Sequence, residues 1–292
     1  ATVRVAGNME SAQLWVGPTL IEQATASFQF MEGTFNVPQW SAMLPAGRVT
    51  GSARLERSEN GPVLTAQVSA EKLKLEKLRS LPDSPHRTAS VRGVVSGELA
   101  LRYDLATGSI RGLGTASAST IVLGSMPPID HLSTRKLELQ DRRVILHDFQ
   151  SSLWGGLATG TITMDLEPHP ANLVEVEINR VERVELAQVL AAWPAAAGRP
   201  RGKLSGAGKL YVPGDSPGRG VFGYGEVELD AGTVCGLPVT HAEGRIEAWD
   251  GATHEFASGR VQPRRGTARI AGPEQKILIN VRDARAARGS IR

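Results

Sequence analysis

The sequence is poor in cysteine and in long apolar runs. Its one cysteine, Cys235, has no partner within the chain for a disulfide, and a single thiol is too few for a zinc or iron–sulfur site. The longest apolar candidate, residues 189–197, is interrupted by Pro194 and is far shorter than the ~20 residues that cross a bilayer as a helix. We therefore expect neither a disulfide framework nor a membrane-spanning helix in this sequence.

Aromatic residues are also scarce, at 5% of the chain, whereas glycine (32) and proline (17) are frequent. A chain with few large rings and many turns is typical of short strands and not of long helices. Apolar residues make up 41% and charged residues 22%, which is the composition of a chain that folds. The length of 292 residues, well above the ~150 of an ordinary domain, leaves two domains or one long repetitive structure.

Basic residues gather at the C-terminal end. From Arg260 onward there are nine Lys or Arg residues against Glu274 and Asp283, although the net charge of the whole chain is only +3. Such an end could contact the phosphates of nucleic acid or of lipid head groups. Because the last residues carry no aromatic side chain that would stack on a base, we interpret residues 282–292 as a basic tail or linker and expect no nucleic-acid partner.

Alternation of apolar and polar residues recurs along the chain. Apolar side chains at every second position predict half-buried strands with one wet face. Clusters of glycine, proline and asparagine separate these stretches, as the turns of an antiparallel sheet do. The clearest predicted strands are residues 97–103, 161–166, 174–178 and 226–230. Two other segments, residues 73–81 and 184–193, have apolar residues at helical spacing and are predicted as short helices that end before a proline.

The chain also resembles itself. Residues 92–97 (RGVVSG) are echoed by residues 201–206 (RGKLSG), and a predicted strand and short helix precede each copy. Stacked repeats bury their apolar faces against their neighbours and grow as a rod or a trough. We predict a partial repeat at 1–66, β-repeat units with a short helix at 67–173 and 174–281, and the basic tail at 282–292.

The fold class predicted from these patterns is mainly β: an elongated, serially repeated antiparallel sheet that curls into an open groove, with short helices between the repeats. An ordinary core between two layers is the alternative for the same apolar residues. In the groove interpretation, acyl chains lie against the apolar strand faces while head groups stay in water. The residues predicted to line it are Leu99, Leu101, Ile121, Leu123, Val144, Leu146, Ile162, Met164, Val227 and Leu229.

Residues suited to catalysis or metal binding are dispersed. The six histidines show no metal-ligand spacing, although His131 and His241 occupy matching repeat positions. Residues 218–223 match GxGxxG, but a loop precedes them and a predicted strand follows, so the match lacks the helix that nucleotide binding needs. The alternating acidic residues at 175–177 and 226–230 are interpreted as a solvated sheet face. We expect no enzyme activity, no catalytic residue, no metal and no cofactor.

One run resembles a known family. Residues 137–149 (LELQDRRVILHDF) are followed by Leu153-Trp154-Gly155-Gly156 and by residues 160–165 (GTITMD). Together with the short helix and RGxxSG turn, this order is similar to that of the AsmA-like superfamily, which includes the TamB-type proteins, over roughly residues 67–270. Residues 258–263 replace the Leu-Trp-Gly-Gly element in the second repeat.

The resemblance implies a periplasmic β-groove of a diderm bacterium that carries phospholipids towards the outer membrane. It also implies an inner-membrane anchor outside this segment and envelope protein partners. The chain begins at Ala1 with no initiator methionine or signal segment, so we interpret it as part of a longer protein. The alternative functions are a structural or adhesive β-repeat of a surface protein, whose apolar face would be filled by its own side chains, and a carbohydrate-active β-protein.

Overall fold

The computed structural model describes residues 4–16, 19–78, 91–123, 128–165, 173–189, 201–213, 222–234, 237–249, 255–256, 259–260, 269–271 and 276–286. Almost all of them lie in strands. The strands and helices are β1 (Arg4–Ser11), β2 (Leu14–Val16), β3 (Thr19–Ile21), β4 (Gln23–Met31), β5 (Thr34–Leu44), β6 (Gly47–Ser58), β7 (Gly61–Lys74), α1 (Leu75–Leu78), β8 (Val91–Asp104), β9 (Ile110–Leu123), β10 (Ile129–Gln140), β11 (Arg143–Leu153), β12 (Gly156–Asp165), β13 (Leu173–Glu185), α2 (Leu186–Val189), β14 (Arg201–Pro213), β15 (Phe222–Val234), β16 (Leu237–Trp249), β17 (Glu255–Phe256), β18 (Gly259–Arg260), β19 (Arg269–Ala271) and β20 (Lys276–Ala286).

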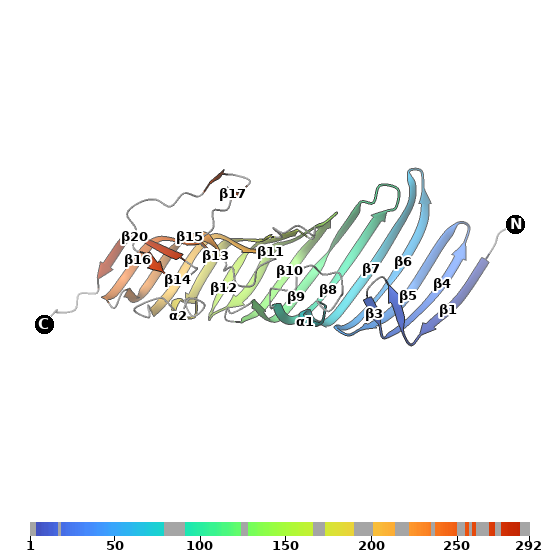
Figure 1. The fold of residues 1–292 in the computed structure, drawn as a ribbon, viewed down its shortest axis with the longest axis horizontal. Helices are drawn as coiled ribbons and strands as arrows, with labels where there is room; N and C mark the ends of the chain where they lie inside the picture. Colours follow the sequence, from blue (N-terminus) through green and yellow to red (C-terminus); the bar gives the residue numbers. More distant parts are fainter. Residues whose placement is uncertain are drawn as a thin grey trace.

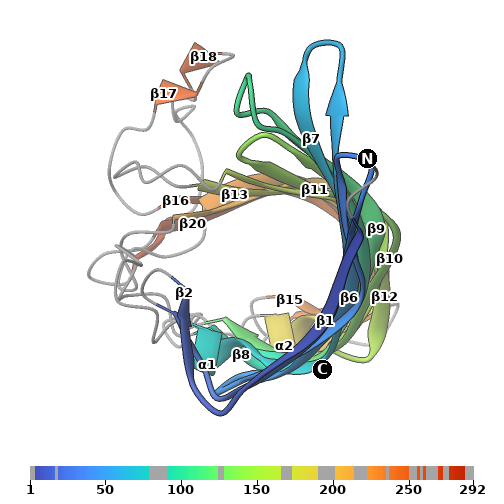
Figure 2. The ribbon, with the colours of Figure 1, turned by 90° about the vertical axis from the view of Figure 1, so that its right-hand side faces the viewer.

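One sheet dominates the molecule. In the described part of the chain it has sixteen strands, in the order β1-β4-β5-β6-β7-β8-β9-β10-β11-β12-β13-β14-β15-β16-β20-β19, and every pair is antiparallel. The strands stand side by side along the long axis of the molecule (Figure 1). The view along that axis shows the sheet curling around a central space, with β1 and β19 as its edges (Figure 2). The predicted fold class is confirmed, and we call the concave side of the curled sheet the trough.

Glycine allows the strands to bend this strongly. A Cβ atom at Gly114 would overlap the carbonyl oxygen of Glu98 on the neighbouring strand, and one at Gly160 would overlap the carbonyl oxygen of Glu177. Only a residue without a side chain fits where a neighbouring backbone approaches so closely. Glycine at such points lets a sheet curl instead of remaining flat.

Bulges keep the same side chains facing the trough. The non-glycine residues Lys72, Thr120, Asp148 and Arg183 have positive φ angles of 51°, 52°, 45° and 56° and lie at or beside register shifts. A bulge adds one residue to a strand and so reverses the alternation that follows it. Leu146 and Phe149 are three positions apart, yet both are buried, because the bulge at Asp148 lies between them.

The two helices of the described chain are a single turn each. α1 follows β7 and α2 follows β13, in agreement with the predicted helices at 73–81 and 184–193, whose remaining residues from 79 and from 190 lie outside the described chain. Both helices lie on the same side of the curl (Figure 2). None of the helices in the ranges given above is long and apolar enough to span a bilayer.

The sequence repeats do not end where strands end. The predicted boundary at 66/67 falls inside β7, the one at 173/174 inside β13 and the one at 281/282 inside β20. Residues 282–286, predicted as part of the basic tail, are therefore strand residues that pair with β16. The sheet is continuous across the predicted boundaries because β7, β13 and β20 each pair with a strand on both sides.

Candidate functional site

An unbroken row of apolar residues and glycines crosses the sheet. Directly opposed residues of antiparallel strands place their side chains on the same face. The register therefore aligns on one face, from β1 to β15, Met9, Ala26, Trp40, Gly51, Val68, Leu99, Gly114, Leu137, Leu146, Ile162, Val176, Leu210 and Gly223. The pairing continues to Ala248, Ile277 and Ile270 in β16, β20 and β19. We call this side of the sheet the apolar face.

Two parallel rows widen the apolar face. The first consists of Val37, Ala53, Ala66, Leu101, Gly112, Leu139, Val144, Met164 and Val174. The second consists of Leu73, Val95, Ala118, Leu132, Ser151, Ala158, Val181, Gly206, Val227 and Gly244. Its one polar member, Ser151, is buried and donates a hydrogen bond from Oγ to the carbonyl oxygen of His131 at 2.9 Å, so it presents no unsatisfied group.

The opposite side of the sheet, the polar face, carries hydroxyls and charges. One of its rows is Glu10, Thr25, Ser41, Thr50, Ser69, Glu98 and Thr115. Exposure differs accordingly, because Leu99 is half-buried whereas Glu98 and Ala100 on either side of it are exposed. The bending glycines and most of the buried side chains belong to the apolar face, which identifies it as the inner side of the curl.

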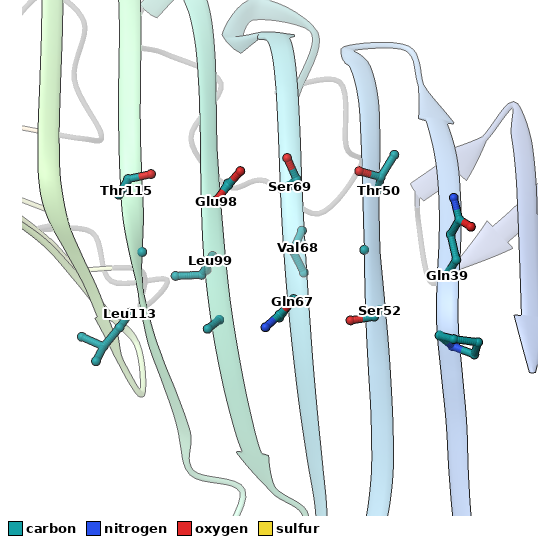
Figure 3. Close-up of a pocket in the computed structure, with 14 residues that line it drawn as sticks. Gln39, Thr50, Ser52, Gln67, Val68, Ser69, Glu98, Leu99, Leu113 and Thr115 are labelled. Carbon is teal, nitrogen blue, oxygen red and sulfur yellow. The ribbon is translucent and has the colours of Figure 1, made fainter. Parts of the chain in front are cut away.

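A hollow of about 540 Å³ lies over β5 to β9, and the side chains around it belong mainly to the polar face. Thr50, Ser69, Glu98 and Thr115 form one line across four strands there (Figure 3). Gly51 and Gly114 contribute backbone between that line and the next.

Apart from Leu123, the predicted groove-lining residues share the apolar face. Leu99, Leu101, Ile121, Val144, Ile162, Met164 and Val227 are half-buried, and Leu146 is buried with 8% of its surface exposed. Ile121, Val144, Ile162 and Met164 pack against the buried cluster of Leu132, Leu146, Phe149 and Ala158. Leu123 is paired with Val91, and its side chain lies outside the described part.

Leu229 differs from the other predicted lining residues. It is only 4% exposed, because Leu186 of α2 and Ala242 of β16 pack with it in one cluster. α2 thus covers part of the apolar face near Leu229. Whether the remaining residues contact a hydrocarbon ligand stays a prediction.

Several residues of the apolar face were not predicted from the sequence. Phe149 was missed because simple alternation from Leu146 assigns it to the polar face, and no residue type announces the bulge at Asp148. Trp40 and Leu137 belong to the central row. The alternation of apolar and polar residues around each of them in the sequence is the signal that could have identified them. The first sixty residues therefore continue the apolar face of the later repeats.

Ion pairs cover the polar face between β13 and β16. Lys209 Nζ lies 3.0 Å from Glu175 Oε1 and 3.6 Å from Glu177 Oε2. The hydrogen bond to Glu175 is the main cause that raises the pKa of Lys209 above its ordinary value. Burial is the main cause that raises the pKa of the neighbouring Tyr211. The acidic alternation at 175–177 therefore belongs to a solvated and charge-paired face.

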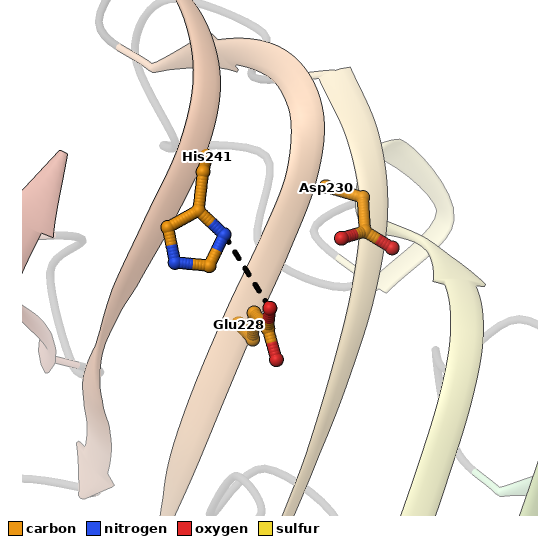
Figure 4. A group of neighbouring side chains, drawn as sticks. All are labelled: Glu228, Asp230 and His241. Carbon is orange, nitrogen blue, oxygen red and sulfur yellow. Dashed lines mark ion pairs between the residues drawn. The ribbon is translucent and has the colours of Figure 1, made fainter. Parts of the chain in front are cut away.

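One group of possible metal ligands occurs among the described residues. Glu228 and Asp230 of β15 and His241 of β16 hold ligand atoms within 4.8 Å of one another (Figure 4). The group is on the polar face, both carboxylates are exposed, and His241 Nδ1 lies 3.4 Å from Glu228 Oε1. The sequence analysis noted the acidic residues at 226–230 and His241 separately, and only the pairing of β15 with β16 brings them together. Exposed charges of this kind are typical of a solvated sheet, so we infer no metal from them.

The GxGxxG match does not continue into a helix. Residues 218–221 lie outside the described chain, while Phe222 and Gly223 begin β15. A phosphate cradle of the dinucleotide type needs a helix that starts at this point. The described residues after the match are strand residues.

Comparison with protein-family models, with curated proteins and with solved structures finds no match to this chain. The AsmA-like resemblance therefore remains a prediction from the sequence. The fold and the site define the class of protein: it is built on an elongated, curled, antiparallel β-sheet with one apolar face.

Proposed function

We propose that this chain is a non-enzymatic, groove-forming segment that carries phospholipid acyl chains along its apolar face between the inner and outer membranes of a diderm cell. The observation that carries the proposal is the central row, in which no polar side chain interrupts the register from Met9 to Gly223. A hydrocarbon chain could move along such a surface without passing a polar barrier. The periplasmic location, the inner-membrane anchor outside this segment and the envelope partners rest on the AsmA-like resemblance.

The energetics favour an acyl chain as the ligand. Each methylene removed from water contributes about 0.8 kcal/mol, so even a partly covered chain is stabilised by several kcal/mol. The half-buried exposure of Leu99, Leu101 and Ile162 leaves apolar area for this contact. The head group needs no pocket of its own, because it stays in water at the open side of the trough.

A structural or adhesive β-repeat is the second candidate. The burial of Leu229 under α2 and of Leu146 within its cluster favours it, because these side chains are already covered by protein. In that case the apolar face would be a core, and hydrocarbon would find no place on it. The two candidates therefore differ in one measurable property, the uptake of lipid.

A lipid-uptake experiment with a matched pair of variants tests the proposal. Leu99→Glu puts a charge into the central row, while Ala100→Glu puts the same charge on the exposed neighbouring position of β8. We expect the wild-type protein and Ala100→Glu to take up a fluorescent phospholipid and shield it from quencher. Leu99→Glu should lower this uptake about tenfold, because a carboxylate must be desolvated under the acyl chain.

Two results would contradict the proposal. One is a wild-type protein that copurifies with no lipid and shields no probe, which would favour the structural repeat. The other is an equal loss of uptake in Leu99→Glu and Ala100→Glu, which would show that the apolar face has no special role. Thermal unfolding of each variant serves as the control for folding.

A further inference from the structure

Large apolar side chains lie close to glycines of the neighbouring strand. A Cβ atom placed on each of five glycines would lie 2.7–3.1 Å from a side-chain atom of its large neighbour. The pairs are Phe28 over Gly7, Trp40 over Gly51, Leu73 over Gly47, Leu101 over Gly112 and Leu229 over Gly202. Because the glycine has no side chain, the large side chain can pack against the backbone of the neighbouring strand. In this position the large side chain takes up less space in the trough.

Two of the predicted lining residues, Leu99 and Leu101, pack over Gly112. A Cβ atom there would lie 2.8 Å from Leu101 Cδ2 and 3.1 Å from Leu99 Cδ1, with the carbonyl oxygen of Ala100 farther away at 3.3 Å. Gly112 is buried, and it pairs directly with Leu101 on one side and Leu139 on the other. An added methyl group at position 112 would therefore displace the flexible ends of two leucines before it strained the backbone.

The displaced side chains have to occupy the trough. The sheet itself lies below them, and Val68 and Leu139 stand on the same face beside them. The added methyl group and the raised leucine ends then lie where an acyl chain would pass. The clearance above β8 and β9 falls by about the size of a methyl group.

We propose that Gly112 is a specificity-determining residue of the trough, which sets the clearance over Leu99 and Leu101 so that methyl-branched as well as straight acyl chains fit. The inference rests on the proposed function and names the class of hydrocarbon that this segment accepts. A straight chain tolerates a shallower trough, whereas a branched chain needs the room that the glycine provides.

The test is a competition in which palmitic acid, which is straight, and phytanic acid, which is methyl-branched, displace cis-parinaric acid from the full chain. We expect the wild type to bind both. Gly112→Ala should keep its affinity for palmitic acid within about twofold and lose about tenfold for phytanic acid, the size expected for one overpacked methyl group. Gly112→Ala/Leu101→Ala should recover phytanic acid, because it removes the raised side chain.

Gly225→Ala is the matched control, since the three atoms nearest to a Cβ atom there belong to the backbone of residues 207 and 208 and not to a large side chain. It should bind both fatty acids as the wild type does. If Gly112→Ala does not fold, Leu139→Phe adds bulk at the position opposite Gly112 and should give the same selective loss.

The outcomes separate the two claims. A wild type that binds neither fatty acid overturns the proposed function and this inference with it. A wild type that binds palmitic but not phytanic acid overturns only the inference, as does a Gly112→Ala variant that binds both normally. Failure of Leu101→Ala to rescue Gly112→Ala would also overturn it.

Discussion

At the residue scale, a few fully covered side chains hold the middle of the sheet together. Phe149 and Ala158 have 3% and 2% of their surface exposed, although the sheet is open along its length. They contact Leu132 and Leu146 across β10, β11 and β12, where the apolar face is most crowded. Substitutions at these positions should therefore resemble those in a compact core.

We expect Phe149→Ala to lower the free energy of unfolding by about 3–5 kcal/mol, because it removes buried ring contacts and leaves a cavity. Leu157→Ala is the matched control, because Leu157 is 56% exposed and should cost less than about 1 kcal/mol. Urea unfolding followed by circular dichroism measures both. Equal losses in the two variants would contradict the assignment of Phe149 to the core.

A second residue-scale prediction concerns acid. Asp104 Oδ1 accepts hydrogen bonds from the backbone N–H groups of Ala106 (2.9 Å) and Thr107 (3.0 Å) in the turn between β8 and β9. The bond from Thr107 is the main cause that lowers the pKa of Asp104 below its ordinary value of 3.8. A carboxyl whose pKa is lower in the folded than in the unfolded state stabilises the fold at pH values above its unfolded-state pKa. This contribution is lost as the pH falls through the folded-state pKa.

Asp104→Asn should therefore flatten the dependence of stability on pH below about pH 4 relative to the wild type. Guanidinium unfolding at a series of pH values between neutrality and strong acid measures this difference. An unchanged acid dependence in Asp104→Asn would show that the turn carboxylate contributes nothing.

At the scale of the elements, bulges decide which face each strand presents. The alternation in the sequence predicts strands and short helices, and both were confirmed, because period two and helical spacing are visible in residue types. The bulges were not predictable, since Lys72, Thr120, Asp148 and Arg183 share no residue type that signals a positive φ. The predicted repeat boundaries also differ from the ends of the strands, because sequence similarity between repeats does not show where a strand begins or which strands pair.

The bulge at Asp148 gives the prediction at this scale. Asp148→Gly should leave stability nearly unchanged, because glycine adopts the φ of 45° without steric cost. Asp148→Val should cost about 1–2 kcal/mol, because a branched Cβ clashes in the left-handed region. Thermal unfolding of the two variants compares them, and equal melting temperatures would contradict a fixed bulge.

At the scale of the whole molecule, the sheet makes the protein long. Sixteen described strands spaced by ~4.8 Å extend over about 70 Å. A compact chain of 292 residues has a radius of gyration of about 19 Å. Small-angle X-ray scattering should give a clearly larger radius and the distance distribution of a rod, and a value near 19 Å would contradict the extended arrangement.

The order of the strands has a consequence for how the chain is made. From β5 to β15, every strand pairs with the strand synthesised just before it and with the strand synthesised just after it. A nascent polypeptide that emerges from its N-terminus can therefore complete each hairpin as soon as it is released, and no segment waits unpaired for a distant partner. Successive addition of strands would limit the time during which an apolar strand remains unpaired. Because unpaired strand edges promote aggregation, this order of assembly would protect the chain from it.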